Sequence, residues 1–599
     1  MERFSHIGPH FSTFSISAAD RAALARTPTR TKSIDLENPL YTTEKALFGH
    51  HKRHGSVVVS SASTDIALSK PAQSATVPVF KPGIRFYLAF SALAALSLVV
   101  ALDGTSISVA LPVIAKALDG SATGAFWAGT AFMLGSTVFL PIFATFSNIF
   151  GRKHITLFAI GLFFAGCVVA GAAQNMAMML VGRAIQGVGG GGITAMTNVL
   201  LTDLVPLRYR GNWIGILGAM WAVGSVSGPV IGGALSHKST WEWIFYLNLP
   251  FILTSFVLVV FFIVLRAVPT SFAEKVRRAD WIGAILFVAS ITSMLVPLTW
   301  GGLTYAWDSW RTITPLGYGF VGLIILAYHE RFIAMEPIIR AAVFGNRTAN
   351  IAYLATALHG MVLWCLLYYQ PLYFEGVRGF SPILAGVALF PATFTVAPMA
   401  ILSGILISKF GRYRWAIWGG WITTTLGVGF MCAIDTDTQL VQIVLTDLCA
   451  GVGLGSLFPA LQFQLQSASP ASYLANAVAM FCFSRGLGQT LGIAIGGNIF
   501  QNSLKQKLSE QPLFASRAAE LATDATALVA WMKDAEPGDA RTIMRAAYTD
   551  SLRLVYIVMA CFACGAAVLS MFVEHYDLDR ALETEQCLVE GAERFEIES

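Results

Sequence analysis

The sequence predicts an all-α polytopic membrane protein with about fourteen transmembrane helices. Of its 599 residues, 55% are hydrophobic and only 13% are charged, whereas soluble domains carry about 25% charged residues. The mean hydropathy of +0.63 is that of a chain whose bulk lies in lipid. The 54 glycines fit this class, because membrane helices use glycine to bring their backbones close together.

Fourteen apolar stretches follow one another along the chain, each close to the ~20 residues that a membrane-spanning helix needs. They cover residues 86–107, 124–143, 154–174, 176–201, 212–235, 243–265, 281–300, 314–329, 349–370, 383–407, 414–433, 439–460, 475–499 and 553–573. The eighth stretch is the shortest. The hydropathy pattern therefore predicts fourteen spans.

The short loops between these stretches differ sharply in charge. One alternate set carries fourteen Lys and Arg residues, from Arg152 to Arg414, and the other set carries four. Basic residues gather on the cytoplasmic side of membrane proteins. We therefore expect both chain termini to be cytoplasmic and the segment 500–552 to be a long outer loop.

The two terminal segments differ from the apolar body. Residues 1–83 are rich in Ser, Thr, His and Pro, and such a polar composition predicts a disordered cytoplasmic tail. Residues 576–599 form an acidic tail, expected on the same side.

An internal repeat divides the apolar body. After the second stretch stands FSNIFGRK, with Gly151 and Arg152, and after the tenth stands GILISKFGRYR, with Gly411 and Arg412, an offset of 260 residues. The fifth and thirteenth stretches carry matching glycine triads at an offset of 264: Gly224, Gly228 and Gly232 against Gly488, Gly492 and Gly496. These offsets predict two six-helix halves, 84–266 and 347–575, with two helices inserted at 267–346.

Several segments resemble the major facilitator superfamily, in particular its fourteen-span drug:proton antiporter branch of fungal toxin and multidrug exporters. They are ALDGTSISVALP (101–112), FSNIFGRK, LVGRAIQGVGGGG (180–192), GSVSGPVIGG (224–233) and WEWIFYLNLP (241–250). The resemblance covers roughly residues 84–575. It implies a major facilitator fold and alternating access about a central cavity.

The resemblance also implies roles for particular residues. The cytoplasmic gating loops would contain Asn148, Gly151, Arg152, Lys153, Gly404, Gly411 and Arg412, and the antiporter motif Gly224, Gly228, Pro229, Gly232 and Gly233. Two departures matter: Asn148 stands where the family's loop carries Asp, and Glu242 where the sixth-helix signature carries Arg. Since Asn148 cannot form an ion pair with Arg152, we expect this gate to rest more on hydrogen bonds.

Ionisable side chains inside the spans are the best candidates for proton coupling, because burying a charge in a bilayer costs roughly 2.5–3.5 kcal/mol or more. They are Asp103, Arg183, His359 and Asp447, with Gln186 one helical turn from Arg183. All lie on the first or fourth span of a half, which line the cavity in this fold. In the family, the arginine at the position of Arg183 is linked to proton coupling.

Each of these residues has a structural alternative. Arg183 can instead be a structural residue held by backbone carbonyls, and Asp103 can be a polar residue near the end of its helix, at the membrane interface. Asp447 predicts either a cross-cavity pair or second protonation site, or an internal hydrogen bond. A lone His359 is most simply a hydrogen-bonding packing residue.

The expected function is proton-driven export of a small amphipathic organic compound, such as a drug, toxin or secondary metabolite, across the plasma membrane. Alternatives are a vacuolar or vesicle membrane, proton-coupled import of a siderophore-type chelate, and, more remotely, a membrane-embedded enzyme. No HExxH, GxSxG or P-loop pattern is present, which argues against an enzyme and ATP-driven transport. We expect no catalytic residues, metal, cofactor or nucleic acid; the partners would be the cargo, protons and lipid, with the protein acting as a monomer.

Overall fold

The computed structural model describes residues 82–120, 122–238, 240–265, 271–302, 305–523 and 525–579. The predicted tails therefore lie outside the described residues, except for their innermost positions. The long helices are α2 (Ile84–Ala117), α3 (Ala122–Phe150), α4 (Arg152–Gly171), α5 (Met176–Leu204), α6 (Arg210–Lys238), α8 (Asn248–Phe262), α10 (Trp281–Trp300), α11 (Trp310–Phe332), α12 (Arg347–Leu372), α14 (Phe390–Phe410), α15 (Arg414–Met431), α16 (Leu440–Ala468), α17 (Leu474–Ser509) and α20 (Asp539–Ser570). The short ones are α7 (Trp243–Tyr246), α9 (Phe272–Arg278), α13 (Pro382–Ala388), α18 (Ala518–Thr523) and α19 (Ala525–Asp534).

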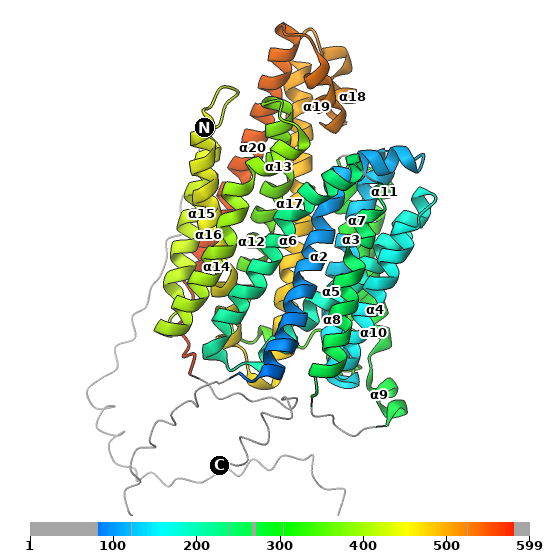
Figure 1. The fold of residues 1–599 in the computed structure, drawn as a ribbon, viewed down its shortest axis with the longest axis vertical. Coiled ribbons are helices and arrows are strands. Elements are labelled where there is room, and N and C mark those ends of the chain that lie inside the picture. The colour runs from blue at the N-terminus through cyan, green and yellow to red at the C-terminus, as the bar shows by residue number, and fades with distance from the viewer. Residues whose placement is uncertain are drawn as a thin grey trace, which may run out of the picture. The chain divides into compact units, whose positions relative to one another are not determined.

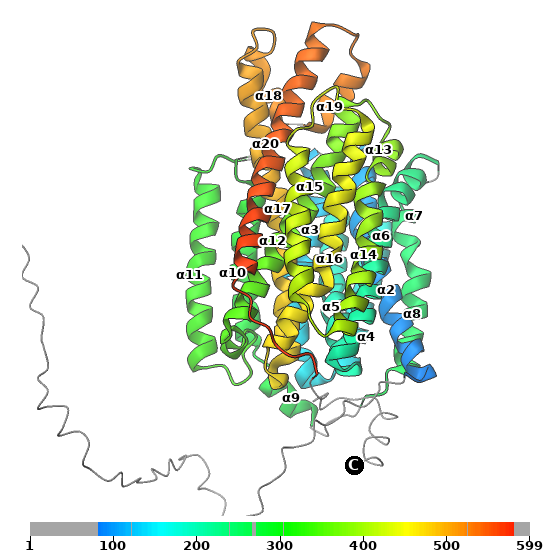
Figure 2. The same ribbon diagram turned by 90° about the vertical axis from the view of Figure 1, so that its left-hand side faces the viewer.

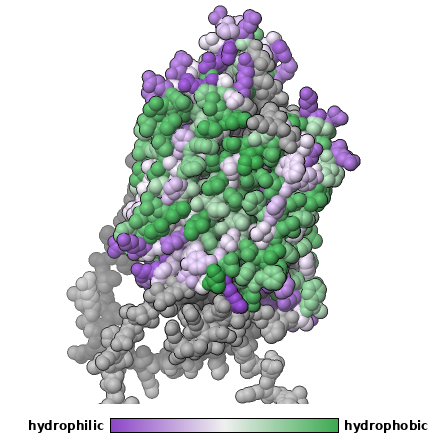
Figure 3. Space-filling model, in the orientation of Figure 1, coloured by the Kyte–Doolittle hydropathy of each residue, from purple (hydrophilic) through white to green (hydrophobic). Residues whose placement is uncertain are grey.

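A long helix lies at each of the fourteen predicted positions, so the all-α membrane fold class is confirmed. Within the described residues, twelve helices are long and apolar enough to cross a membrane. The other two are α5, which contains many glycines and the polar residues Arg183, Asn198 and Asp203, and α15, which contains Arg414 with several Gly, Trp and Thr residues; these lower the mean hydropathy. The predicted count is thus about right. Figure 3 shows an apolar flank between two polar ends, as expected for a protein surrounded by lipid.

The segment 500–552, predicted as a long outer loop, is largely helical, and its place on the outer side stays a prediction. Helix α17 continues to Ser509, α18 and α19 follow, and α20 already begins at Asp539. Hydropathy marks only the apolar stretches, whereas these helices continue beyond them and make contacts of their own. Phe500 and Tyr548 meet edge to face at 4.8 Å, and Lys533 Nζ lies 3.3 Å from Glu375 Oε2.

We call the end of the bundle at α18 and α19 the cap face (Figure 1). The opposite end, where α3 ends and α4 begins at Gly151, is called the loop face.

The helices pack as two groups with the same internal arrangement (Figures 1 and 2). In the first group, α2 packs on α6, α5 on α3 and α4, and α8 on α2. In the second, α12 packs on α17, α16 on α14 and α15, and α20 on α12. The groups meet where α6 packs on α14 and where α3 packs on α17, while α10 and α11 pair beside α3 and α17. The two groups contain the helices of the two predicted halves, and α10 and α11 are the predicted inserted pair; the domain bounds themselves stay a prediction.

The repeated glycines make the repeated contacts. A Cβ on Gly228 or Gly232 of α6 would lie 2.1 Å from an oxygen of Thr105 or Ser106 on α2. In the matching triad of α17, a Cβ on Gly488 or Gly492 would lie 1.9 or 2.4 Å from a backbone oxygen of α12. Only hydrogen fits at such distances, so the sequence offset of 264 reflects a real structural repeat.

Candidate functional site

A polar cluster lies buried inside the first group. Arg183 Nη1 donates a hydrogen bond to Asp103 Oδ2 at 2.6 Å. Asp103 Oδ1 accepts two more, from Gln186 Nε2 at 2.7 Å and from Asn248 Nδ2 at 2.9 Å. Asp103, Arg183 and Gln186 have no exposed surface. The structure thus brings together three of the predicted residues and adds Asn248 of α8, which the sequence reasoning missed.

The arginine of this cluster is held by several contacts. Its Nε donates to the Ala128 carbonyl at 3.0 Å, its Nη1 also reaches Gln186 Oε1 at 2.7 Å, and its guanidinium carbon lies 4.4 Å from the centre of the Phe132 ring. Its Nη2 has no hydrogen-bond partner in the described part of the chain. Buried ion pairs persist only when such additional bonds compensate the loss of hydration.

A central cavity of about 120 Å³ lies between the two groups, lined by α2, α3, α5 and α6 on one side and by α12, α16 and α17 on the other. Its walls combine rings with small polar groups. Trp221, Trp364 and Phe458 supply rings; Asn198, Gln462 and Gln489 supply amides. A cavity of this size holds a benzene-sized molecule. A larger cargo requires the groups to separate.

The predicted proton-coupling residues are not part of the wall of this cavity, and their role in coupling stays a prediction. Asp103, Arg183, Gln186, His359 and Asp447 are absent from its wall, whereas their neighbours Gly104 and Phe132 are part of it. The reason is helical geometry. The first and fourth spans of each group do line the cavity, as expected, but these polar side chains point into the packing between helices of one group.

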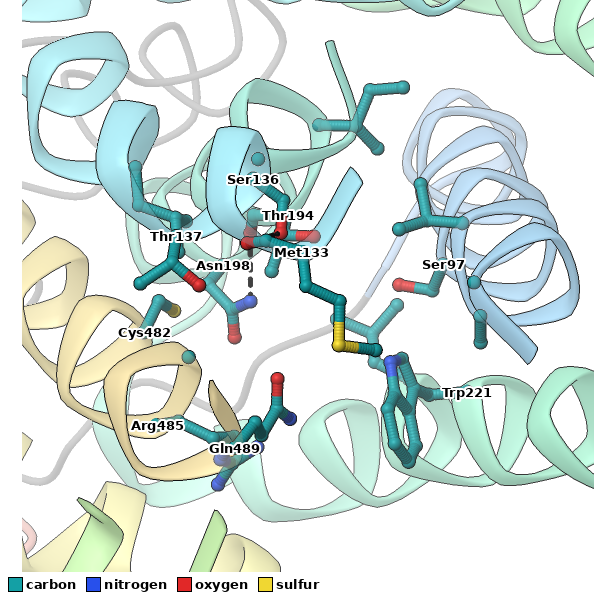
Figure 4. Close-up of a pocket in the computed structure, with 18 of the residues that line it drawn as sticks. Ser97, Met133, Ser136, Thr137, Thr194, Asn198, Trp221, Cys482, Arg485 and Gln489 are labelled. Atoms are coloured by element: carbon teal, nitrogen blue, oxygen red, sulfur yellow. Dashed lines mark hydrogen bonds between the residues drawn. The ribbon is translucent and has the colours of Figure 1, made fainter. Parts of the chain in front are cut away.

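The wall contains one charged side chain, Arg485 of α17. Figure 4 shows it beside Gln489, across the cavity from Ser136 and Thr194. The sequence reasoning missed it, although Arg485 lies in the predicted span 475–499 and satisfies the same criterion that selected Arg183.

The second group carries a counterpart of the buried cluster. Asp447 of α16 accepts a hydrogen bond from Gln370 of α12 at 2.5 Å, so the first and fourth spans are joined by a carboxylate in both groups. The predicted pairing of Asp447 across the cavity is not formed. Its Oδ2 has no hydrogen-bond partner, and no cation pairs with it within the described residues.

His359 takes the structural alternative. It is 1% exposed, and its Nε2 donates to the Leu454 carbonyl at 3.0 Å, joining α12 to α16. It does not line the cavity.

The loop face is closed by polar contacts. Arg152 forms a buried ion pair with Asp203 of α5, at 2.9 Å from Nε to Oδ2, so it keeps an acidic partner although Asn148 replaces the usual Asp. Asn148 instead donates to Asn476 of α17 at 3.3 Å, which links the two groups. Asn148 thus makes a hydrogen bond between the groups, whereas Arg152 has an ion pair and a hydrogen bond to Ser147; the gating role of both residues stays a prediction.

Further cross-group bonds lie nearby. Gln462 donates to Asn198 Oδ1 at 3.2 Å, and Arg210 donates to Gln466 Oε1 at 2.9 Å. A Cβ on Gly404 of α14 would lie 2.3 Å from the Gly211 carbonyl of α6. The groups are in close contact at this end of the bundle.

The remaining loop residues have structural roles. Gly151 and Gly411 have φ of +96° and +66°, a region that favours glycine. Lys153 Nζ donates to the Val260 carbonyl at 2.6 Å, whereas Arg412 is exposed. In the antiporter motif, Gly224, Gly228 and Gly232 pack α6 on α2; Pro229 lies within α6 and Gly233 is buried.

We expect Asn148→Ala to loosen the loop face. Losing one neutral hydrogen bond between the groups should make their separation at this face about 1 kcal/mol easier, which raises the population of the separated state about fivefold. The readout is the alkylation rate of Cys482, which lines the cavity, by a membrane-impermeant maleimide added on the loop-face side, with the other cysteines replaced.

Asn350→Ala is the matched control, because the Asn350 amide donates to the Phe344 carbonyl and does not join the groups. Equal alkylation rates in Asn148→Ala and the control would mean that Asn148 does not hold the gate.

The comparisons with known proteins agree with this architecture. Residues 93–493 match the family model described as Major Facilitator Superfamily. The chain belongs to this superfamily. The facilitator chain is 46% identical over 507 residues to MFS transporter L2 of a Phoma species, covering 85% of each protein. It is 37% identical to the MFS-type efflux pump LUC4 of a Fusarium species, covering 85% of this chain and 91% of that one.

Solved structures support the fold alone. The facilitator chain aligns with the proton:xylose symporter XylE at a TM-score of 0.50 and 16% identity, covering 83% of this chain and 98% of the other. At that identity, the likeness carries no information about cargo. In the described part of this facilitator, no group of three or more His, Cys, Asp or Glu residues is placed to hold a metal ion.

Proposed function

We propose that the protein is a secondary active exporter that exchanges protons for a small amphipathic organic compound by alternating access. The observation that carries this proposal is the buried Asp103–Arg183 ion pair beside the central cavity. A carboxylate with no exposed surface can change its charge only by binding or releasing a proton, and such intramembrane groups mark proton pathways.

The cluster can hold both protonation states of Asp103. When ionised, the carboxylate accepts hydrogen bonds from Arg183, Gln186 and Asn248. When protonated, it no longer neutralises Arg183, which keeps the Ala128 carbonyl, Gln186 Oε1 and the Phe132 ring. Each state therefore leaves the arginine with partners, as reversible protonation demands.

Phe132 is the physical link from this cluster to the cargo. Its ring contacts the Arg183 guanidinium and also forms part of the cavity wall. A change in the charge balance of Arg183 can thus alter the wall that the cargo touches. Asp447, buried without a cation, is the second protonation site that we propose.

Export rather than import rests on the relatives. Efflux is named in LUC4 and in the efflux pump FUS6 of Gibberella fujikuroi, which is 35% identical over 515 residues. The aromatic and amide groups of the cavity suit an amphipathic cargo. We place the exporter in the plasma membrane because of its resemblance to exporters, and both termini in the cytoplasm because of its loop charges.

The test uses purified protein in vesicles whose loop face points outward, with an acidic lumen and an extract of the source organism's small organic compounds outside. With one proton exchanged per neutral cargo molecule, a pH difference of one unit drives about tenfold accumulation. Mass spectrometry of the lumen identifies the accumulated compound.

Two outcomes oppose the proposal. Accumulation only in vesicles of the opposite orientation, with acid outside, would indicate import. Accumulation that does not depend on the pH gradient would indicate transport without proton exchange.

A further inference from the structure

The guanidinium of Arg485 is a cation without a counterion in the cavity wall. Its Nε and Nη2 are buried without a hydrogen-bond partner, and no carboxylate pairs with it within the described residues. Its carbon lies 4.0 Å from the ring centre of Phe458 and 5.0 Å from that of Phe481. The rings stabilise the charge in part, but the N–H donors remain available.

The surroundings of Arg485 offer nothing acidic. None of the residues that line the cavity is Asp or Glu. The neighbouring polar groups are amides: Gln489 lies one turn along α17, and Gln462 bonds Asn198 across the groups. The rest of the wall is largely apolar, and the rings of Trp221 and Trp364 contact each other at an angle of 57°, with 6.1 Å between their centres.

We propose that this cavity binds an anionic cargo, with a carboxylate or sulfonate on Arg485 and an apolar or aromatic body packed against Trp221 and Trp364. This inference rests on the proposed export function, because it takes the bound compound to be the one that is transported. An arginine presents a planar fork of donors that fits two oxygens of such a group. The amide of Gln489 is placed to donate to the same group, while a cationic compound would be repelled.

A purely structural role accounts poorly for this residue. Arg183, the arginine of the first group, is surrounded by a carboxylate, a carbonyl and an amide. Arg485 has rings only, and an unpaired charge at this depth is unfavourable. A residue that costs stability in the empty protein and faces a cavity is best explained by what enters the cavity.

The experiment measures binding to the purified full-length protein in detergent by equilibrium dialysis. The probes share one aromatic body and differ in charge: naphthalene-2-sulfonate, 2-naphthylmethyltrimethylammonium and 2-naphthalenemethanol. We expect the wild type to prefer the sulfonate. Arg485→Gln should weaken sulfonate binding about ten- to a hundredfold, as expected for the loss of charge-assisted hydrogen bonds, and change binding of the neutral alcohol by less than about twofold.

Two further variants sharpen the comparison. Arg485→Lys keeps the charge and should recover part of the sulfonate affinity. Lys505→Gln removes an exposed cation from the same helix and should change nothing. Unaltered sulfonate binding in Arg485→Gln, or equal loss of all three probes, would overturn the inference.

Thermal unfolding gives an independent readout. If Arg485 serves the cargo, Arg485→Gln should melt at or above the wild-type temperature, because an unpaired buried charge is removed. The sulfonate should raise the melting temperature of the wild type only. A clear loss of stability in Arg485→Gln would assign a structural role instead.

Binding requires no proton gradient, so the two proposals fail separately. Selective sulfonate binding without proton-driven accumulation in vesicles would remove the export mechanism and keep the anion site. Proton-driven transport of a neutral or cationic compound, with no sulfonate selectivity, would do the reverse.

Discussion

Replacing Asp103 with Asn abolishes proton-driven transport while the protein still folds and inserts. Asn has nearly the same shape and can still accept a hydrogen bond from Arg183, but it cannot take up or release a proton. We expect the initial rate of accumulation driven by a pH gradient to fall at least a hundredfold, which corresponds to a rise of about 2.7 kcal/mol or more in the barrier. Exchange of cargo for cargo across the membrane, which needs no proton, should continue.

Two matched substitutions accompany this variant. Asp119→Asn changes an exposed carboxylate just beyond the end of α2 and should leave transport unaltered. Asp447→Asn makes the same change at the equivalent cluster of the second group and tests the second protonation site by the number of protons exchanged per cargo molecule. Proton-driven accumulation at the wild-type rate in Asp103→Asn would remove Asp103 from the coupling mechanism.

The second large effect is expected from a single methyl group. A Cβ on Gly488 would lie 1.9 Å from the backbone oxygen of Ala357, and a backbone atom cannot rotate away. Gly488→Ala must therefore push α17 from α12, and we expect it to lower the free energy of unfolding by about 3 kcal/mol. The measurements are the melting temperature and the monodisperse fraction after extraction from the membrane.

The control is a glycine without neighbours. A Cβ on Gly419 of α15 would meet nothing within 4 Å, so Gly419→Ala should be neutral or slightly stabilising, because Ala favours helix over Gly. If Gly488→Ala and Gly419→Ala melted at the same temperature, the repeated glycine triads would not be packing determinants.

The parts of the site that the sequence predicted are those marked by a local signal. Asp103, Arg183 and Gln186 are polar residues in apolar stretches. Because burying such residues in a membrane is unfavourable, their presence there indicates a role. Asn248 and Asp203 carry no such mark, since Asn and Asp are ordinary near helix ends. Their roles depend on Arg183 and Arg152 lying beside them, which hydropathy cannot report.

Helix lengths show the same limit. The apolar stretch at 475–499 predicted a span of ordinary length, whereas α17 extends to Ser509 and carries the cap-face segment with α18, α19 and α20. Polar residues beyond the hydrocarbon layer remain helical there because Phe500, Tyr548 and Lys533 find partners on other helices. Such contacts join distant parts of the chain, so no window of sequence contains them.

The sequence by itself determined the membrane class, the positions of the spans and the two-part repeat. The length of an apolar stretch is a property of one helix, and the spacing of glycines is a property of one pair of packed helices, so both can be read from short segments. Only the tertiary structure decided which partner each buried charge has. Asp103 and Arg183 are 80 residues apart and form a pair; Asp447 and Arg485 remain without one. In a low dielectric, whether a partner of opposite charge lies within a few ångströms decides whether a buried charge is neutralised. Because Arg485 has no such partner, we propose it as the residue that binds the anionic group of the cargo.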